Sequence, residues 1–172
     1  MPGSATENKF IVREWFNQIQ PRLILDVGPG CGTYSTLLRS GKPTEDNQKW
    51  YGVEVFEPYI EKYNLKSKYE HIIVQDVKEV DFSKLPTFDL IIAGDILEHL
   101  EKQDAITVIE RLKQHTKNLI ISIPIIDYPQ GPSEGNVHET HLSNFNWNEM
   151  KEIVKPKEFL VGTILGYYWW QG

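Results

Sequence analysis

The sequence is poor in cysteine and in long hydrophobic runs, and each shortage excludes a class of protein. Cys31 is the only cysteine among 172 residues. No disulfide can therefore form within the chain, and we expect a reducing, cytoplasmic compartment. No apolar run approaches the roughly 20 residues of a membrane span. The N-terminus also lacks the basic stretch and apolar stretch of a secretory signal.

Positive charge is scarce as well. Eighteen lysines and arginines face 24 acidic residues, which gives a net charge of -6, and the basic residues are scattered. A polyanionic partner normally selects a basic surface, so the composition disfavours nucleic acid as a partner. The chain length suits one domain, which we assign to residues 5–172. We expect Met1–Ser4 to be an artificial leader left from expression.

Short apolar runs alternate with segments of helical periodicity. Strands are predicted over residues 23–25, 50–55, 71–74, 88–93 and 118–123, and helices over 8–20, 33–39, 104–115 and 147–154, with a further helix beginning at Pro58. This alternation is typical of βαβ units. We therefore expect an α/β fold with a mostly parallel central sheet flanked by helices. Ligands of such sheets bind beyond the carboxyl ends of the strands.

The segment from Phe159 to Trp170 is harder to interpret. Gly162 and Gly166 interrupt it, and its residues suffice for one clear strand. We therefore expect a sheet without a complete C-terminal hairpin, or a domain taken from a longer, multidomain chain. The aromatic run Tyr167–Trp170 fits a core strand, a platform for stacking a sugar ring, or an edge for a homodimer.

A glycine-rich corner follows the first predicted strand and opens a helix. Its sequence is Asp-Val-Gly-Pro-Gly-Cys-Gly, with Asp26 first and glycines at Gly28, Gly30 and Gly32. Glycines allow a tight turn and a close approach of ligand to backbone. Such corners often hold a pyrophosphate, but the acidic Asp26 suits a ligand with an ammonium and a sulfonium. The corner alone would also fit a purely structural turn or a nicotinamide dehydrogenase.

Two more acids end the next two strands. Glu54 ends the second, where a carboxylate can accept hydrogen bonds from both hydroxyls of a ribose. Asp76 follows the third and is placed to accept from an adenine amino group. Phe56 could lie against the adenine ring. Three acids at three successive strand ends predict an adenosyl site with a cationic tail.

The order of these motifs resembles that of class I S-adenosylmethionine (SAM) dependent methyltransferases. The resemblance runs through LILDVGPGCG, YGVEVFEPY, VQDV, FDLIIAGDILEHL and NLIISIPI, which is nearly the whole chain. It implies a Rossmann-like class I methyltransferase fold and SAM as the cofactor. The cofactor-binding residues that it implies are Asp26, Gly28, Gly30, Gly32, Glu54, Val55, Phe56, Asp76, Val77 and Asp95.

Acidic and imidazole side chains follow the fourth and fifth strands, where the methyl acceptor would bind. A hydroxyl acceptor usually needs a base, and we take Asp95, Glu98 and His141 as the catalytic candidates. The Glu139-x-His141 pattern after Pro-Gln-Gly and Gly-Asn elements resembles a group of bacterial methyltransferase domains, some associated with surface glycans. That resemblance implies O-methylation of a sugar or glycan hydroxyl.

The motif Asp95-x-x-Glu98-His99 with a later histidine is similar in form to one in small-RNA 2′-O-methyltransferases, which hold a divalent cation. It implies a Mg²⁺ or Mn²⁺ site at Asp95, Glu98, His99 and His141, with His138 as the alternative to His141. The same residues leave open an RNA 2′-O-methyltransferase, and a non-catalytic SAM-binding domain of a larger protein. They also leave open the alternative that these histidines bind no metal and only stabilise loops.

Overall fold

The computed structural model describes residues 6–39 and 48–172. Met1–Ser4 and most of the polar loop after the second predicted helix lie outside these residues. Within them, seven strands form one sheet in the order β3-β2-β1-β4-β5-β7-β6. The strands are β1 (Leu23–Val27), β2 (Lys49–Glu54), β3 (His71–Val74), β4 (Leu90–Gly94), β5 (Asn118–Pro124), β6 (Glu158–Val161) and β7 (Leu165–Gln171). The first five are parallel, as predicted.

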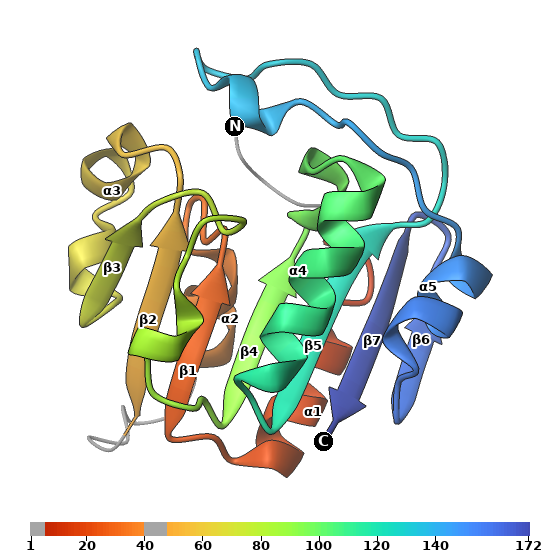
Figure 1. Cartoon of the computed structure of the whole chain (residues 1–172), viewed down its shortest axis with the longest axis horizontal. Coiled ribbons are helices and arrows are strands. Elements are labelled where there is room, and N and C mark those ends of the chain that lie inside the picture. The colour runs from red at the N-terminus through yellow and green to blue at the C-terminus, as the bar shows by residue number, and fades with distance from the viewer. Residues whose placement is uncertain (1–5, 40–47) are drawn as a thin grey trace.

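Different helices cover the two faces of the sheet, with α4 in front and α1 and α2 behind (Figure 1). The helices are α1 (Phe10–Ile19), α2 (Thr33–Arg39), α3 (Pro58–Lys62), α4 (Lys102–Gln114) and α5 (Trp147–Val154). Side chains of β4 alternate between the two faces. Ile91 and Ala93 belong to the hydrophobic cluster with α4 and α5, and Leu90 and Ile92 to the cluster with α1, α2 and α3. This alternation is the two-residue period of a strand buried on both faces.

Short 3₁₀ helices interrupt the connections. They are η1 (Leu65–Ser67), η2 (Phe82–Lys84), η3 (Leu97–His99) and η4 (Val137–Glu139). The link between β3 and β4 contains η2, where no helix was predicted from the sequence. Among the described residues, no helix has both the length and the apolar character needed to cross a bilayer.

The C-terminal hairpin is complete, so the expectation of a missing strand was wrong. β6 pairs antiparallel with β7, and β7 pairs antiparallel with β5. The turn lies at residues 162–164, where the Gly162 amide donates to Leu165 O at 2.8 Å. β7 is therefore an inner strand, and Tyr167 and Tyr168 are fully buried. The aromatic run is a core strand, which removes the sugar-platform and edge interpretations of Tyr167–Trp169.

Candidate functional site

The carboxyl ends of the parallel strands meet at one edge of the sheet and form a cleft. The strand register sets Val27 opposite both Val53 and Ala93, and Glu54 opposite Val74. Residues that directly follow β1, β2, β3, β4 and β5 therefore lie side by side. They line the cleft together with the long loop after β5 and the turn of the β6–β7 hairpin.

The glycine corner forms one wall of the cleft. Gly28, Gly30 and Gly32 have φ values of 68°, 54° and 79°, which side chains rarely adopt. A Cβ added at Gly28 would lie 2.8 Å from Cδ1 of Ile96, so that position also needs the missing side chain for space. Gly28 and Gly30 line the cleft, whereas Gly32 lies behind it, against Lys68.

Asp26 does not line the cleft, contrary to its assignment to the cofactor. It lies beneath the glycine corner with an exposed fraction of 1%. Its Oδ2 accepts a hydrogen bond from the Tyr69 hydroxyl at 2.6 Å. Burial raises the pKa of Asp26 to about 7, although the Tyr69 bond opposes the shift. Asp26 lies at the predicted place, just before the glycine corner, but its side chain points into the core because β1 is buried on both faces.

Glu54 is nearly buried at the end of β2 and organises the backbone around it. Its two carboxylate oxygens accept from the amides of Gly30, at 3.1 Å, and Phe56, at 2.9 Å. Burial raises its pKa despite these two bonds. Glu54 and Val55 line the cleft, but Phe56 does not, because its ring packs edge-on against Tyr59 at 4.8 Å between centroids.

Asp76 and Val77 line the cleft after β3. The Asp76 carboxylate accepts from the Lys78 amide at 2.9 Å and pairs with the Lys78 ammonium at 3.6 Å. Its side chain is 28% exposed, so water still reaches it. Of the expected cofactor residues, seven therefore share one cleft, namely Gly28, Gly30, Glu54, Val55, Asp76, Val77 and Asp95, and Asp26, Gly32 and Phe56 stand outside it.

Asp95 lies directly after β4 with a positive φ of 54°. Its Oδ1 accepts from the Ser122 hydroxyl at 2.8 Å, and its Oδ2 pairs with Lys9 Nζ at 3.0 Å. Both carboxylate oxygens of Asp95 therefore already have partners. Asp95 is not among the three side chains whose possible ligand atoms converge, so the structure does not group it with the other expected metal ligands.

Glu98, His99 and His141 do converge. One ligand atom from each lies within 4.8 Å of the others. The two imidazoles are oriented by backbone carbonyls, since Nδ1 of His99 lies 3.2 Å from Thr140 O and Nδ1 of His141 lies 2.5 Å from Tyr128 O. If each Nδ1 carries the proton, each Nε2 keeps its lone pair for a ligand.

Electrostatics at this group suit a cation. Glu98 is 3% exposed, and its Oε2 is buried without a hydrogen-bond partner among the described residues. Burial and the charge of Asp95 raise the pKa of Glu98 well above its usual value. Burial and the neighbouring His141 lower the pKa of His99 to about 4, so its ring is neutral at pH 7. A bound cation would satisfy the unpartnered oxygen and could take both imidazoles as ligands.

The long loop after β5 is held over the cleft by its own polar residues. Gln130 Nε2 donates to Glu139 O at 2.8 Å, and the His141 amide donates to Gln130 O at 3.0 Å. Asn136 caps η4 by accepting from the His138 amide at 2.9 Å. His138 itself is exposed and lies outside the Glu98 group. The Pro-Gln-Gly and Gly-Asn elements of the sequence therefore shape the loop that positions His141.

Sequence reasoning missed two side chains beside the cleft. Lys9, in the N-terminal segment, pairs with Asp95, and its Nζ also lies 3.3 Å from the hydroxyl of Tyr34 on α2. Tyr34 also shares a 2.6 Å hydrogen bond with Ser122. Tyr34 could have been suspected from its place two residues after Gly32. No pattern pointed to Lys9, because its role depends on how the N-terminal segment folds back.

The comparisons with known proteins agree with this geometry. A family model described as a methyltransferase domain matches residues 24–118, more than half of the chain. The N-terminal domain of EvdMO1 with S-adenosylhomocysteine (SAH) bound has a TM-score of 0.69 at 12% identity, over 98% of this chain and 82% of that one. The same domain in the presence of SAH and D-fucose gives 0.68 at 13%, over 99% and 85%.

A SAM-dependent methyltransferase from Clostridium acetobutylicum gives a TM-score of 0.68 at 13% identity, over 95% of this chain and 90% of that chain. Identities this low show the shared fold alone. A comparison with curated protein sequences finds no match. The family model across β1 to β5, together with the sheet order and the strand-end cleft, shows that the chain belongs to the methyltransferase-domain family as a class I SAM-dependent methyltransferase.

Proposed function

We propose that the protein methylates a hydroxyl oxygen of a sugar or glycan, with a divalent cation at Glu98, His99 and His141. The observation that carries the proposal is the convergence of these three side chains on the wall of the cleft that contains the cofactor residues. The N-terminal domain of EvdMO1, which shares this fold, was crystallised in the presence of SAH and D-fucose. That observation on another protein supports a sugar acceptor here.

The cofactor end of the cleft is proposed at β1, β2 and β3. Glu54 would accept hydrogen bonds from the ribose hydroxyls and Asp76 from the adenine amino group, while Gly28 and Gly30 let the ligand approach the backbone. SAM supplies a methyl group on a sulfonium, which is already strongly electrophilic. The protein therefore has to hold the acceptor oxygen about 3 Å from that carbon and accept its proton.

The acceptor end is proposed at η3 and the loop after β5. Glu98, His99 and His141 would hold the cation, and the partly buried Glu139 lines the same wall. A cation there lowers the pKa of a hydroxyl that it binds. Two imidazoles and one carboxylate suit Mn²⁺ better than Mg²⁺, which prefers oxygen ligands. Because Asp95 is not one of the three converging side chains, the ligand set favours Mn²⁺ over Mg²⁺.

Turnover on sugar acceptors tests the proposed function. The full chain is incubated with SAM and hexoses or deoxyhexoses that carry neighbouring hydroxyls, and SAH formation is followed. We expect turnover that EDTA lowers at least about tenfold and Mn²⁺ restores, because removal of a catalytic cation exposes the full cost of deprotonating a hydroxyl. An RNA oligonucleotide serves as the comparison acceptor.

Turnover that EDTA leaves unchanged would refute the metal. Methylation of the RNA but of no sugar would refute the acceptor class and favour the 2′-O-methyltransferase alternative. The net charge of -6 makes that second result unexpected, because phosphate contacts need positive charge.

Glu54→Gln is expected to weaken SAH binding about 30-fold, or about 2 kcal/mol, because a carboxylate that accepts from two hydroxyls becomes a neutral amide. Titration calorimetry measures the effect. Glu61→Gln, on the exposed side of α3, is the matched control and should bind like the parent. Equal SAH affinity in the Glu54 variant and the parent would place the ribose elsewhere.

Three further expectations stay predictions. The location in a reducing compartment rests on the lone Cys31, whose Sγ lies 3.3 Å from Thr33 Oγ1. The extent of the domain, residues 5–172, includes residues outside the described ones. Self-association remains a prediction as well, now with β6 and not the aromatic run at the edge of the sheet.

A further inference from the structure

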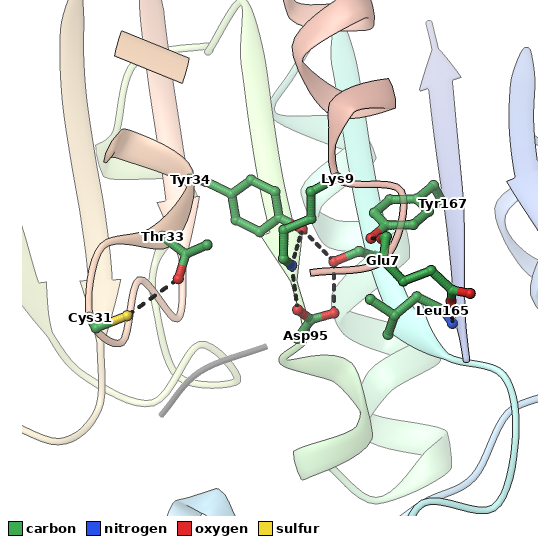
Figure 2. A network of polar contacts seen from close by, with 9 residues as sticks. Glu7, Lys9, Cys31, Thr33, Tyr34, Asp95, Leu165 and Tyr167 are labelled. Atoms are coloured by element: carbon green, nitrogen blue, oxygen red, sulfur yellow. Dashed lines mark hydrogen bonds and ion pairs between the residues drawn. The ribbon is translucent and has the colours of Figure 1, made fainter. Parts of the chain in front are cut away.

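The N-terminal strap, which we define as residues 6–9, is fastened to the turn of the β6–β7 hairpin (Figure 2). The Glu7 carboxylate accepts from the amides of Thr163, Ile164 and Leu165 at 2.7, 2.8 and 2.9 Å. These bonds lower the pKa of Glu7 to about 2, so the carboxylate is ionised at neutral pH. The Tyr167 hydroxyl also donates to Glu7 O. The strap therefore has a fixed place beside the cleft, since Ile164 and Leu165 line it.

The strap carries Lys9 into the space between α2 and the end of β4. The Lys9 side chain is 8% exposed, and Nζ lies 3.0 Å from Asp95 Oδ2 and 3.3 Å from the Tyr34 hydroxyl. Asp95 and Tyr34 both line the cleft, and Lys9, which does not line it itself, contacts both of them from behind. An ammonium offers three N–H donors, and these two contacts use two of them. Among the residues that the structure describes, the third donor has no partner.

The cleft is lined by negatively charged side chains, so a buried lysine beside it matters for the binding of an anionic group. Its described lining contains five carboxylates, from Glu54, Asp76, Asp95, Glu98 and Glu139, and neither a lysine nor an arginine. An anionic group that enters this cleft must be compensated. Two lysines pair with lining acids, Lys9 with Asp95 and Lys78 with Asp76. Lys78 is 41% exposed, so Lys9 is the buried one.

We propose that Lys9 binds the α-carboxylate of SAM while Asp95 binds its α-ammonium group. The inference rests on the proposed placement of the cofactor. The amino-acid end of SAM bears one negative and one positive charge, and the Lys9–Asp95 pair presents the complementary charges beside the glycine corner. Tyr34 and Ser122 hold this pair in position. The strap is then part of the cofactor site, and Glu7 fixes it there.

Calorimetry with truncated ligands tests the proposal without turnover. The full chain and Lys9→Met are titrated with SAH, with decarboxylated SAH, which lacks only the carboxylate, and with 5′-methylthioadenosine, which lacks the amino-acid portion. We expect Lys9→Met to weaken SAH binding about 30-fold and to change the other two affinities less than about threefold. Lys102→Met, an exposed lysine on α4, is the matched control and should bind all three like the parent. Lys9→Arg should retain most of the SAH affinity because it keeps the charge.

Several results would overturn the proposal. An equal loss for SAH and decarboxylated SAH would mean that Lys9 supports the fold and does not touch the carboxylate. Unchanged SAH binding in Lys9→Met would leave the carboxylate to the backbone amides of the glycine corner. Retained binding of 5′-methylthioadenosine shows that a variant is folded. Failure of the parent chain to bind any of the three ligands would instead refute the cofactor site itself, and this inference with it.

Discussion

Glu98→Ala is expected to lower methyl transfer by about 100-fold or more, in line with the loss of a group that assists proton removal. Glu98 is buried with an unpartnered Oε2, and its carboxylate meets the imidazoles of His99 and His141 within 4.8 Å. Without the carboxylate the site keeps its two imidazoles and loses its only negative ligand. Turnover is followed as SAH formation, and Mn²⁺ affinity by electron paramagnetic resonance.

The binding measurements separate a metal role from a structural one. Glu98→Ala should lose Mn²⁺ binding while its SAH affinity stays within about threefold, because the proposed cofactor contacts do not include the Glu98 side chain. Glu110→Ala, at an exposed position on α4, is the control and should leave both unchanged. If Glu98→Ala keeps full turnover, or if the parent chain binds no Mn²⁺, the proposed cation site is wrong.

Asp26→Asn is expected to stabilise the protein above pH 7 by up to about 4 kcal/mol. The pKa of Asp26 is about 7 in the folded state and has an ordinary value of 3.8, so the folded state holds the proton more tightly than the unfolded state. The free energy of unfolding therefore falls as pH rises from about 4 to about 7, and the full cost persists above. Each pH unit of difference is worth 1.36 kcal/mol. Asparagine removes the buried charge and still accepts from Tyr69.

Urea unfolding at pH 4 and pH 8 measures this effect. At pH 4 both chains carry a neutral side chain, and their free energies of unfolding should agree closely. Tyr69→Phe should behave in the opposite sense, losing more stability at pH 8 than at pH 4, because its hydroxyl donates to the charged form at 2.6 Å. A stability difference between Asp26→Asn and the parent that does not vary with pH would contradict the raised pKa.

The parallel part of the sheet could be predicted closely from the sequence. The third strand has the predicted bounds, His71–Val74, since it is a short apolar run between residues that favour turns. The first strand begins at Leu23 as predicted but runs two residues further, to Val27. The fourth strand begins two residues later than predicted, because Phe88 forms only an isolated bridge with Thr116. The hairpin was missed because apolar and aromatic residues continue through both of its strands, with a single glycine, Gly162, in the turn.

Part of the candidate site could also be predicted from the sequence, and part could not. Residues at strand ends, such as Glu54 and Asp76, could be placed in one cleft because topology alone brings strand ends together. Direction could not be predicted, and Asp26 points under the corner while Asp95 turns toward Lys9. Those directions depend on partners far away in the sequence, such as Lys9, 86 residues from Asp95. Local patterns carry no information about such partners.

The fastening of Glu7 to residues 163–165 has a consequence for the order of events during synthesis. The strap is synthesised well before its anchor, because Leu165 follows Glu7 by 158 positions in the sequence. β7, which separates β5 from β6, is also made after both of them. A nascent chain thus exposes one side of β5 until β7 has left the exit tunnel, and the strap stays unanchored until residues 163–165 have emerged. Lys9 gains its fixed position only after that point.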